Sequence, residues 1–276
     1  MGKRTVGDVE LEVHEEGNGD PALLLLHGFT GSSLDWTDVT GDLARNRRVV
    51  AYDQRGHGDS TNTGDPASYT IGQLTTDLGS VVDQLGLAPF DLLGHSMGGI
   101  VAMQYAVAHP EKLRSLILMD TFAEPTGGIP ASWIDYVVGV ARENGMEGVA
   151  EMFLSYIDQA PNAGDLTPER REELASRIRY KLTHMDVEAL DQLGRGLGTF
   201  DALLDGVAGL RMPVTVIVGE KDSGLREPAE VLAKAIPDAV LEVIPAAGHS
   251  PQEDNAPSWL AAVRGHLGRA EAQPKA

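Results

Sequence analysis

Short apolar runs recur in the first and last parts of the chain and alternate with stretches of helical spacing. Residues 9–14 alternate apolar and polar positions, which is typical of a half-exposed strand, whereas the continuous apolar run at 22–26 is typical of a buried one. Further buried strands are predicted at residues 48–52, 91–93, 113–119, 214–218 and 240–244, with helices at 69–87, 100–108, 228–236 and 257–267. This alternation predicts an α/β fold, with a mostly parallel sheet and helices on both faces.

The alternation stops between residues 121 and 205, where only helical patterns are visible. The sequence therefore predicts two domains: a core formed by residues 1–120 and 206–276, and a helical cap, or lid, at 121–205 inserted into it. Aromatic side chains of the cap recur at helical spacing, which is more often typical of a helix core than of a ligand pocket. Three of them are nevertheless candidates for the substrate pocket, because some of the cap must face the sheet that it covers: Trp133, Phe153 and Tyr156.

The apolar run at 91–93 leads into a G-x-S-x-G sequence at residues 94–98, and a helical pattern follows at once. A strand that turns directly into a helix holds its apical residue in a strained conformation above the edge of the sheet. Gly94 and Gly98 remove side chains that would collide in so tight a turn. The start of the helix also directs free N–H groups at any negative charge beside Ser96. The pattern therefore predicts that Ser96 is a nucleophile.

A serine nucleophile needs an imidazole to take its proton and a carboxylate to orient that imidazole. Among the histidines beyond Ser96, His249 is favoured because it lies in a glycine-flanked loop after a predicted core strand. Three carboxyls, those of Asp222, Glu220 and Asp120, follow strands at the same predicted sheet edge. Asp222 is favoured because it lies far enough past its strand to curl back over the edge. Asp120 is its competitor, and Glu220 comes too early.

The oxyanion of a tetrahedral intermediate requires N–H donors. The backbone N–H of Met97 follows from the turn around Ser96, and Phe29, in the glycine-containing loop after residues 22–26, offers the second donor. The side chains of Phe29 and Met97 would then border the acyl pocket. The charged loop at residues 53–60 is interpreted as a rigid turn held by hydrogen bonds, not as a catalytic element.

Composition and charge narrow the possible partners. The chain has 22 basic and 41 acidic residues, a formal charge of −19, which disfavours nucleic acid and anionic membrane surfaces because both would be repelled. It contains no cysteine, which excludes disulfides, thiolate catalysis and cysteine-ligated metal centres. The first residues lack the apolar stretch of a signal peptide, and no later run is long enough to span a bilayer, so a cytoplasmic location is expected.

With these motifs in this order, from the loop at 27–29 through residues 94–99 to Asp222 and His249, the chain resembles an α/β-hydrolase with a helical cap over nearly its whole length. The resemblance implies an eight-stranded sheet whose second strand is antiparallel, and it supports the Phe29 and Met97 amides as oxyanion donors. Serine at position 96 differs from haloalkane dehalogenases and epoxide hydrolases, which have aspartate there. Carbon–carbon bond hydrolases often have asparagine where this chain has His95, which weakens the case for carbon–carbon bond hydrolysis.

The resemblance is greatest to bacterial carboxylesterases and lactonases. The resulting hypothesis is a serine hydrolase in which Ser96, His249 and Asp222 cleave small to medium, neutral, largely apolar esters or lactones through an acyl-enzyme. No cofactor and no metal is implied. Four alternatives stay open: an enol-lactonase, a carbon–carbon bond hydrolase, a cofactor-free perhydrolase or haloperoxidase, and a ligand receptor that does not turn over.

Overall fold

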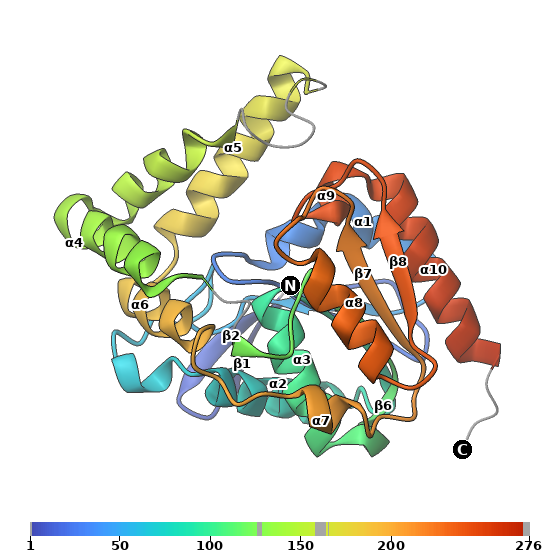
Figure 1. Cartoon of the computed structure of the whole chain (residues 1–276). Coiled ribbons are helices and arrows are strands. Elements are labelled where there is room, and N and C mark those ends of the chain that lie inside the picture. Colours follow the sequence, from blue (N-terminus) through green and yellow to red (C-terminus); the bar gives the residue numbers. More distant parts are fainter. Residues whose placement is uncertain (1, 126–128, 158–163, 165, 273–276) are drawn as a thin grey trace.

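The computed structural model describes residues 2–125, 129–157, 164 and 166–272 (Figure 1). Within these residues the sheet has eight strands, which confirms the predicted fold class. The strands are β1 (Gly2–Val6), β2 (Val9–Glu16), β3 (Leu23–Leu26), β4 (Val49–Tyr52), β5 (Phe90–His95), β6 (Leu113–Met119), β7 (Val214–Gly219) and β8 (Val240–Ile244). Strand β1 was not predicted, because only one of its five residues is fully buried and the strand lacks a long apolar run.

The strands lie in the order β1-β2-β4-β3-β5-β6-β7-β8. Strand β2 pairs antiparallel with both β1 and β4, and the pairs from β4 onward are parallel. Every side chain of β3, β5 and β7 is buried, as expected of strands with helices on both faces. Because parallel strands point the same way, the loops that follow β3, β5, β6, β7 and β8 emerge at one edge of the sheet.

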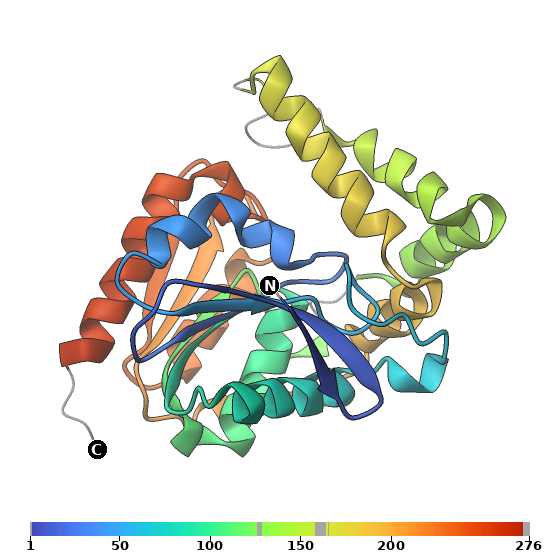
Figure 2. The same cartoon turned by 180° about the vertical axis from the view of Figure 1, so that it is seen from behind.

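Helices cover both faces of the sheet (Figures 1 and 2). On one face, α1 (Thr37–Leu43), α9 (Pro251–Asp254) and α10 (Ala256–Ala272) lie together, and Trp36 and Trp259 are fully buried there with their ring centroids 6.2 Å apart. The other face carries α2 (Ile71–Leu85), α3 (Met97–Ala108), α7 (Leu204–Val207) and α8 (Arg226–Ala235). Short 3-10 turns lie at η1 (Ser33–Trp36), η2 (Pro66–Ser68) and η3 (Pro110–Lys112).

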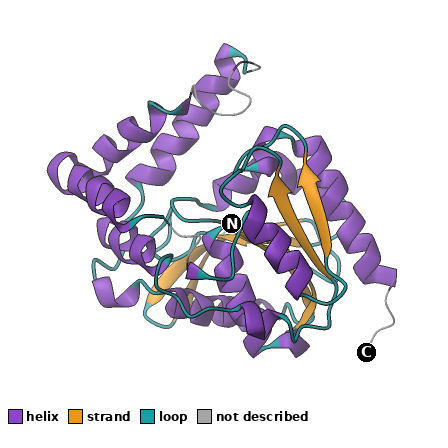
Figure 3. Ribbon diagram, in the orientation of Figure 1, coloured by secondary structure: helices purple, strands orange, loops and turns teal. Residues whose placement is uncertain are grey.

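The chain between β6 and β7 contains helices and no strand in its described part (Figure 3). This helical insertion consists of α4 (Ala131–Leu154), α5 (Pro168–Thr183) and α6 (Val187–Gly196). The helical pattern predicts separate helices at 133–144 and 148–158, and α4 is indeed divided into two helical stretches by non-helical backbone at Gly145, at φ 69° and ψ 178°. Residue 158, the predicted end of the second, lies outside the described residues. None of the described helices is long and apolar enough to cross a membrane.

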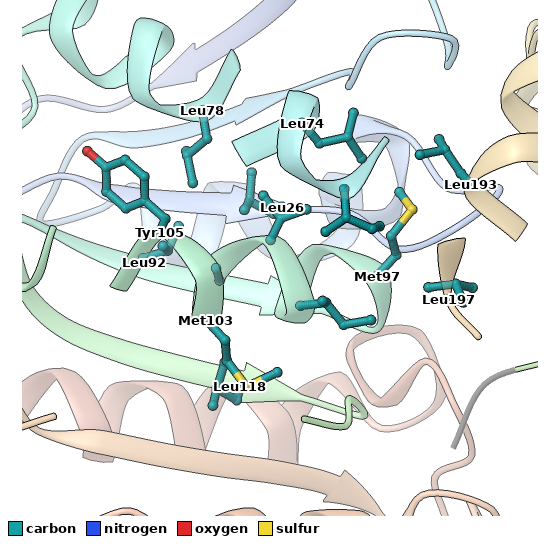
Figure 4. Packing of buried hydrophobic residues seen from close by; sticks show 14 of the residues in the cluster. Leu26, Leu74, Leu78, Leu92, Met97, Met103, Tyr105, Leu118, Leu193 and Leu197 are labelled. Atoms are coloured by element: carbon teal, nitrogen blue, oxygen red, sulfur yellow. The ribbon is translucent and has the colours of Figure 1, made fainter. Parts of the chain in front are cut away.

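Helix α3 is buried along almost its whole length, so it lacks the polar face of a surface helix. Figure 4 shows its side chains between the strands and the neighbouring helices, with Met97 near Leu193 of α6 and near Leu197, which directly follows α6. The side chain of Met97 is fully buried in this cluster. The insertion therefore shares one apolar core with the first turn of α3, directly beside Ser96.

Candidate active site

Ser96 occupies the turn between β5 and α3 with φ 52° and ψ −116°, a backbone conformation that L-residues rarely adopt. Glycines make this turn possible. A Cβ on Gly94 would lie 2.3 Å from the carbonyl oxygen of Gly98, and a Cβ on Gly98 would lie 2.6 Å from that of His27. The structure thus has the strand, sharp turn and helix that the G-x-S-x-G sequence predicts.

Hydrogen bonds hold the backbone of Ser96 in this strained conformation. Its N–H donates to the carbonyl oxygen of Met119 at 2.9 Å. Its own carbonyl oxygen accepts from the Thr121 hydroxyl at 2.7 Å and from the N–H of Gly99 at 2.9 Å. The sequence analysis missed Thr121, because a threonine after a strand carries no motif of its own.

His249 and Asp222 meet at the same edge of the sheet. His249 Nδ1 lies 2.7 Å from Asp222 Oδ2, so the imidazole donates from Nδ1 and Nε2 is left to accept a proton. Burial alone would raise the pKa of Asp222, but the hydrogen bond and charge of His249 outweigh it, and the pKa is lowered. Asp222 is therefore ionised at neutral pH. The Ser96 hydroxyl makes no hydrogen bond in the described part of the chain, so its O–H is available to donate one.

His95 connects the serine turn to the His249 loop. His95 Nε2 lies 2.7 Å from the carbonyl oxygen of His249, and the two ring centroids are 4.9 Å apart. Burial, together with the proximity of His249, lowers the pKa of His95 to about 3. His95 is thus neutral and donates from Nε2 to that carbonyl. Its neighbour Ser96 and the imidazole of His249 are in this way held at one rim of the sheet.

The two other predicted carboxyls have different partners. Glu220 Oε2 accepts the N–H of Ala246 at 2.8 Å. Asp120 is fully buried, and its Oδ1 accepts the N–H of Gly219 at 3.0 Å. Of the three candidates, Asp222 is the one whose carboxylate is hydrogen-bonded to His249.

The loop after β3 approaches Ser96 closely. A Cβ on Gly28 would lie 3.0 Å from the Cβ of Ser96, so the backbone of this loop borders the nucleophile. The loop is anchored by His27, whose Nε2 accepts the N–H of Gln54 at 3.0 Å and whose Nδ1 donates to the Gly28 carbonyl at 2.8 Å. Phe29 points at α6, where a Cβ on Gly194 would lie 3.2 Å from its Cζ.

Three of the aromatic side chains predicted to face the substrate lie in the segment between β6 and β7. Trp133 and Phe153 are partly buried and form an edge-to-face pair with centroids 6.0 Å apart. Tyr156 is 56% exposed and lies outside this pair. A cavity of about 290 Å³ lies near the Asp222 loop and is lined in part by Phe122, Gly224 and Leu232. Contact of Trp133, Phe153 or Tyr156 with a substrate stays a prediction.

The loop at residues 53–60 has the hydrogen bonds of a rigid turn. The Asp53 carboxylate accepts the N–H groups of Ser33 at 2.7 Å and Asp59 at 2.9 Å. His57 is fully buried, and burial lowers its pKa to about 3. These contacts agree with the structural interpretation of the loop and leave its histidine neutral.

In the described chain, the side chains of Asp120, Asp222 and His249 form a group that could hold a metal ion, with one ligand atom of each within 4.8 Å of the others. The hydrogen bond between Asp222 and His249 already accounts for much of this proximity. The donor set is that of an acid–imidazole pair, and no step of the reaction below is assigned to a metal.

Ion pairs join helix α5 to the core beside the site. Arg177 donates to both carboxylate oxygens of Asp38, at 2.8 and 3.0 Å, and Lys181 Nζ lies 2.5 Å from Asp35 Oδ1. Glu253 on α9 also faces Lys181. Burial raises the pKa of Glu253 to about 7; Lys181 opposes this and Asp35 adds to it. The folded protein therefore binds a proton at Glu253 that the unfolded chain releases at lower pH.

Glu253→Gln is expected to stabilise the protein in alkaline solution. Because the folded-state pKa is raised, the stability linked to the Glu253 proton is present below the unfolded-state pKa of a glutamate and is lost as the pH rises through about 7. Urea midpoints at acidic and alkaline pH measure this. The variant should exceed the parent at alkaline pH and match it at acidic pH. Glu227→Gln, at an exposed position of α8, is the control. An equal difference at both values of pH would contradict the assignment.

Comparison with known proteins places these features in one family. The model of the alpha/beta hydrolase fold matches residues 21–256. A putative 2-succinyl-6-hydroxy-2,4-cyclohexadiene-1-carboxylate synthase of Bacillus subtilis is 30% identical over 265 residues, which is 89% of this chain and 90% of the relative. A putative carbamate hydrolase of Variovorax paradoxus is 28% identical and covers 87% of this chain and 88% of its own.

Two solved structures are similar over nearly the whole chain. The enol-lactonase from Burkholderia xenovorans superimposes with a TM-score of 0.82 at 25% identity, covering 97% of this chain and all 100% of the lactonase. A thermophilic esterase from Thermogutta terrifontis superimposes with a TM-score of 0.80 at 28% identity, covering 97% of this chain and 96% of the esterase. Since the family model spans most of the sequence and the turn around Ser96 has the geometry of its nucleophile elbow, the chain belongs to the alpha/beta hydrolase fold family of enzymes.

Proposed function

We propose that this protein is a serine hydrolase that cleaves carboxylic esters, lactones among them, through an acyl-enzyme. The observation that carries the proposal is the 2.7 Å hydrogen bond from His249 Nδ1 to Asp222, at the sheet edge where Ser96 stands at a strained turn. A carboxylate on Nδ1 orients the imidazole so that Nε2 can act as a base. The His95 contact to the His249 carbonyl supports the approach of that base to Ser96.

In the proposed reaction, Ser96 Oγ attacks the ester carbonyl carbon while His249 Nε2 accepts the hydroxyl proton. Asp222 stabilises the imidazolium that forms. The backbone N–H groups of Met97 and Phe29 donate to the oxyanion, in keeping with the approach of the loop at 27–31 to Ser96. The carbon–oxygen bond of the tetrahedral intermediate then breaks, and His249 gives its proton to the leaving alkoxide. Water repeats the sequence on the acyl-enzyme and frees the acid.

The proposed substrates are small to medium, neutral and largely apolar. The insertion would act as a cap domain at 121–205 over a core of 1–120 and 206–276, with Trp133 and Phe153 beside the pocket. The side chain of Met97 is buried against α6 of the insertion, which supports an apolar site for the acyl group. The net charge of −19 disfavours anionic substrates, nucleic acid and anionic membranes. The names of the enol-lactonase and the esterase agree with this substrate class. A cytoplasmic location stays part of the proposal.

A substrate panel with a covalent probe tests the proposal. The protein is assayed with p-nitrophenyl acetate, longer acyl esters, lactones and vinylogous diketones, and intact mass with peptide mapping follows labelling by a fluorophosphonate. We expect many turnovers on esters or lactones and a single adduct on Ser96. One product release followed by stalling would indicate a receptor, and cleavage of diketones alone would indicate a carbon–carbon bond hydrolase. Product partition towards hydrogen peroxide would indicate a perhydrolase. Labelling at another residue would contradict the proposal.

A further inference from the structure

Asp120 lies at the edge of the sheet beside the acid–imidazole pair, directly after the last residue of β6. It is fully buried, at φ 43°. Its Oδ1 accepts the N–H of Gly219 at 3.0 Å, while its Oδ2 is buried without a hydrogen-bond partner among the described residues. Such an orphaned atom is rare in folded proteins and calls for an explanation. Atoms of Asp120, Asp222 and His249 all lie within 4.8 Å of one another.

The groups that face Asp120 disfavour a second negative charge there. They are Asp222 in the loop after β7, Asp254 on α9 and the imidazole of His249 in the loop after β8. Two carboxylates sharing a buried site cannot both ionise without large repulsion, so one of them keeps a proton. Asp222 has the His249 donor and the N–H of Leu225 to stabilise its charge. Asp120 has the single N–H of Gly219.

We propose, building on the function proposed above, that Asp120 is a positioning residue that keeps its proton at neutral pH and donates it from Oδ2 to the carboxylate of Asp222. The two carboxyl groups then carry one negative charge between them. A proton on Oδ2 supplies the hydrogen bond that this atom otherwise lacks. It is consistent with this proposal that burial, followed by the charge of Asp222, raises the pKa of Asp120 well above its usual range, against the opposing Gly219 N–H.

The donated hydrogen bond has a consequence for catalysis. It draws charge from the Asp222 carboxylate, which makes that carboxylate a weaker partner for the protonated imidazole of His249. Without the donor, the imidazolium would be more stable. A higher pH would then be needed before His249 could act as a base. Asp120 therefore sets the pH at which the proposed reaction begins, although it touches neither substrate nor Ser96 in the proposed mechanism.

Infrared difference spectroscopy tests the proton directly and requires no turnover. The spectrum of Asp120→Asn is subtracted from that of the parent at neutral pH. We expect a carbonyl stretching band of a protonated carboxyl that belongs to the parent alone; Glu253 is present in both proteins and cancels. A lost carboxylate band in its place would overturn the proposal. Asparagine is close in shape and tolerates positive φ. If Asp120→Asn fails to fold, the spectrum of Glu253→Gln at neutral pH is measured instead. A protonated-carboxyl band that persists in this variant supports the proposal, and its loss overturns it.

The pH dependence of kcat/KM for two variants tests the positioning role. Asp120→Asn keeps a neutral donor, so its rate should stay within about twofold of the parent and the acidic limb should not move. Asp120→Ala removes the donor, so kcat should fall by about tenfold and the acidic limb should move to higher pH. An acidic limb at lower pH in the asparagine variant would mean that Asp120 is charged. A folded, inactive asparagine variant would make Asp120 the catalytic acid. Either result overturns the proposal, whereas an inactive parent would refute only the proposed function.

Discussion

Ser96→Ala is expected to lower kcat for ester hydrolysis by roughly 10⁴- to 10⁶-fold, because no other group on the sheet edge can form the acyl-enzyme in the proposed mechanism. The remaining rate would come from substrate binding and the oxyanion donors. The fold should be unaffected, since alanine retains a Cβ and the turn already accommodates one at φ 52°. The carbonyl of residue 96 would keep its contact with the Thr121 hydroxyl.

Initial rates on p-nitrophenyl acetate, with circular dichroism to confirm folding, measure this loss. Ser80→Ala is a matched control, because Ser80 lies on α2 and donates to the carbonyl of Thr76 at 3.2 Å, away from the site. It should retain the parent rate. Fluorophosphonate labelling should disappear in Ser96→Ala and persist in the control. Parent-level turnover by Ser96→Ala would remove the basis for the proposed nucleophile.

Asp77→Ala is expected to destabilise the fold by about 3–5 kcal/mol, because it leaves a buried guanidinium without its main partner. Arg55 and Asp77 have side chains 1% and 2% exposed. Arg55 Nε lies 2.6 Å and Nη2 2.8 Å from the two carboxylate oxygens of Asp77. Asp8, a more distant partner at 3.2 Å, is 68% exposed and cannot replace this pairing. The pair joins the loop at 53–60 to helix α2.

Urea unfolding of Asp77→Ala and of the double variant Arg55→Met/Asp77→Leu measures the effect. The double variant removes both charges and fills similar volume, so it should recover most of the lost stability. Comparable destabilisation of the two proteins would show that lost packing, not the unpaired charge, is responsible. An unchanged midpoint in Asp77→Ala would contradict the assignment of a buried pair.

Hydrophobic periodicity was sufficient for most of the sheet, because strands buried on both faces consist almost wholly of apolar residues. Leu23–Leu26 is the plainest example. Strand β1 (Gly2–Val6) was missed because it lies at the edge of the sheet and is held by pairing with β2, not by an apolar sequence of its own. The break at Gly145, by contrast, could be predicted, because the helical pattern is interrupted between residues 144 and 148.

Ser96 could be singled out because its chemistry is local: strand, turn and helix are contiguous, and the glycines that the turn requires lie within two residues of it. His95 and Thr121 could not, because their contacts, to the carbonyls of His249 and Ser96, join segments 154 and 25 residues apart. The G-x-S-x-G pattern contains His95 but does not predict its contact with His249, and Thr121 belongs to no motif.

The sequence alone determined that three acidic residues, Asp120, Glu220 and Asp222, follow strands at one edge. Which of them meets His249 was decided by tertiary structure, because backbone conformation directs Asp120 towards the Gly219 N–H, Glu220 towards that of Ala246 and Asp222 towards the imidazole. Tertiary structure also decides which of these carboxyls keeps a proton. Charge at a carboxyl depends on burial and on the donors around it, and those are brought together from distant parts of the chain only when it folds.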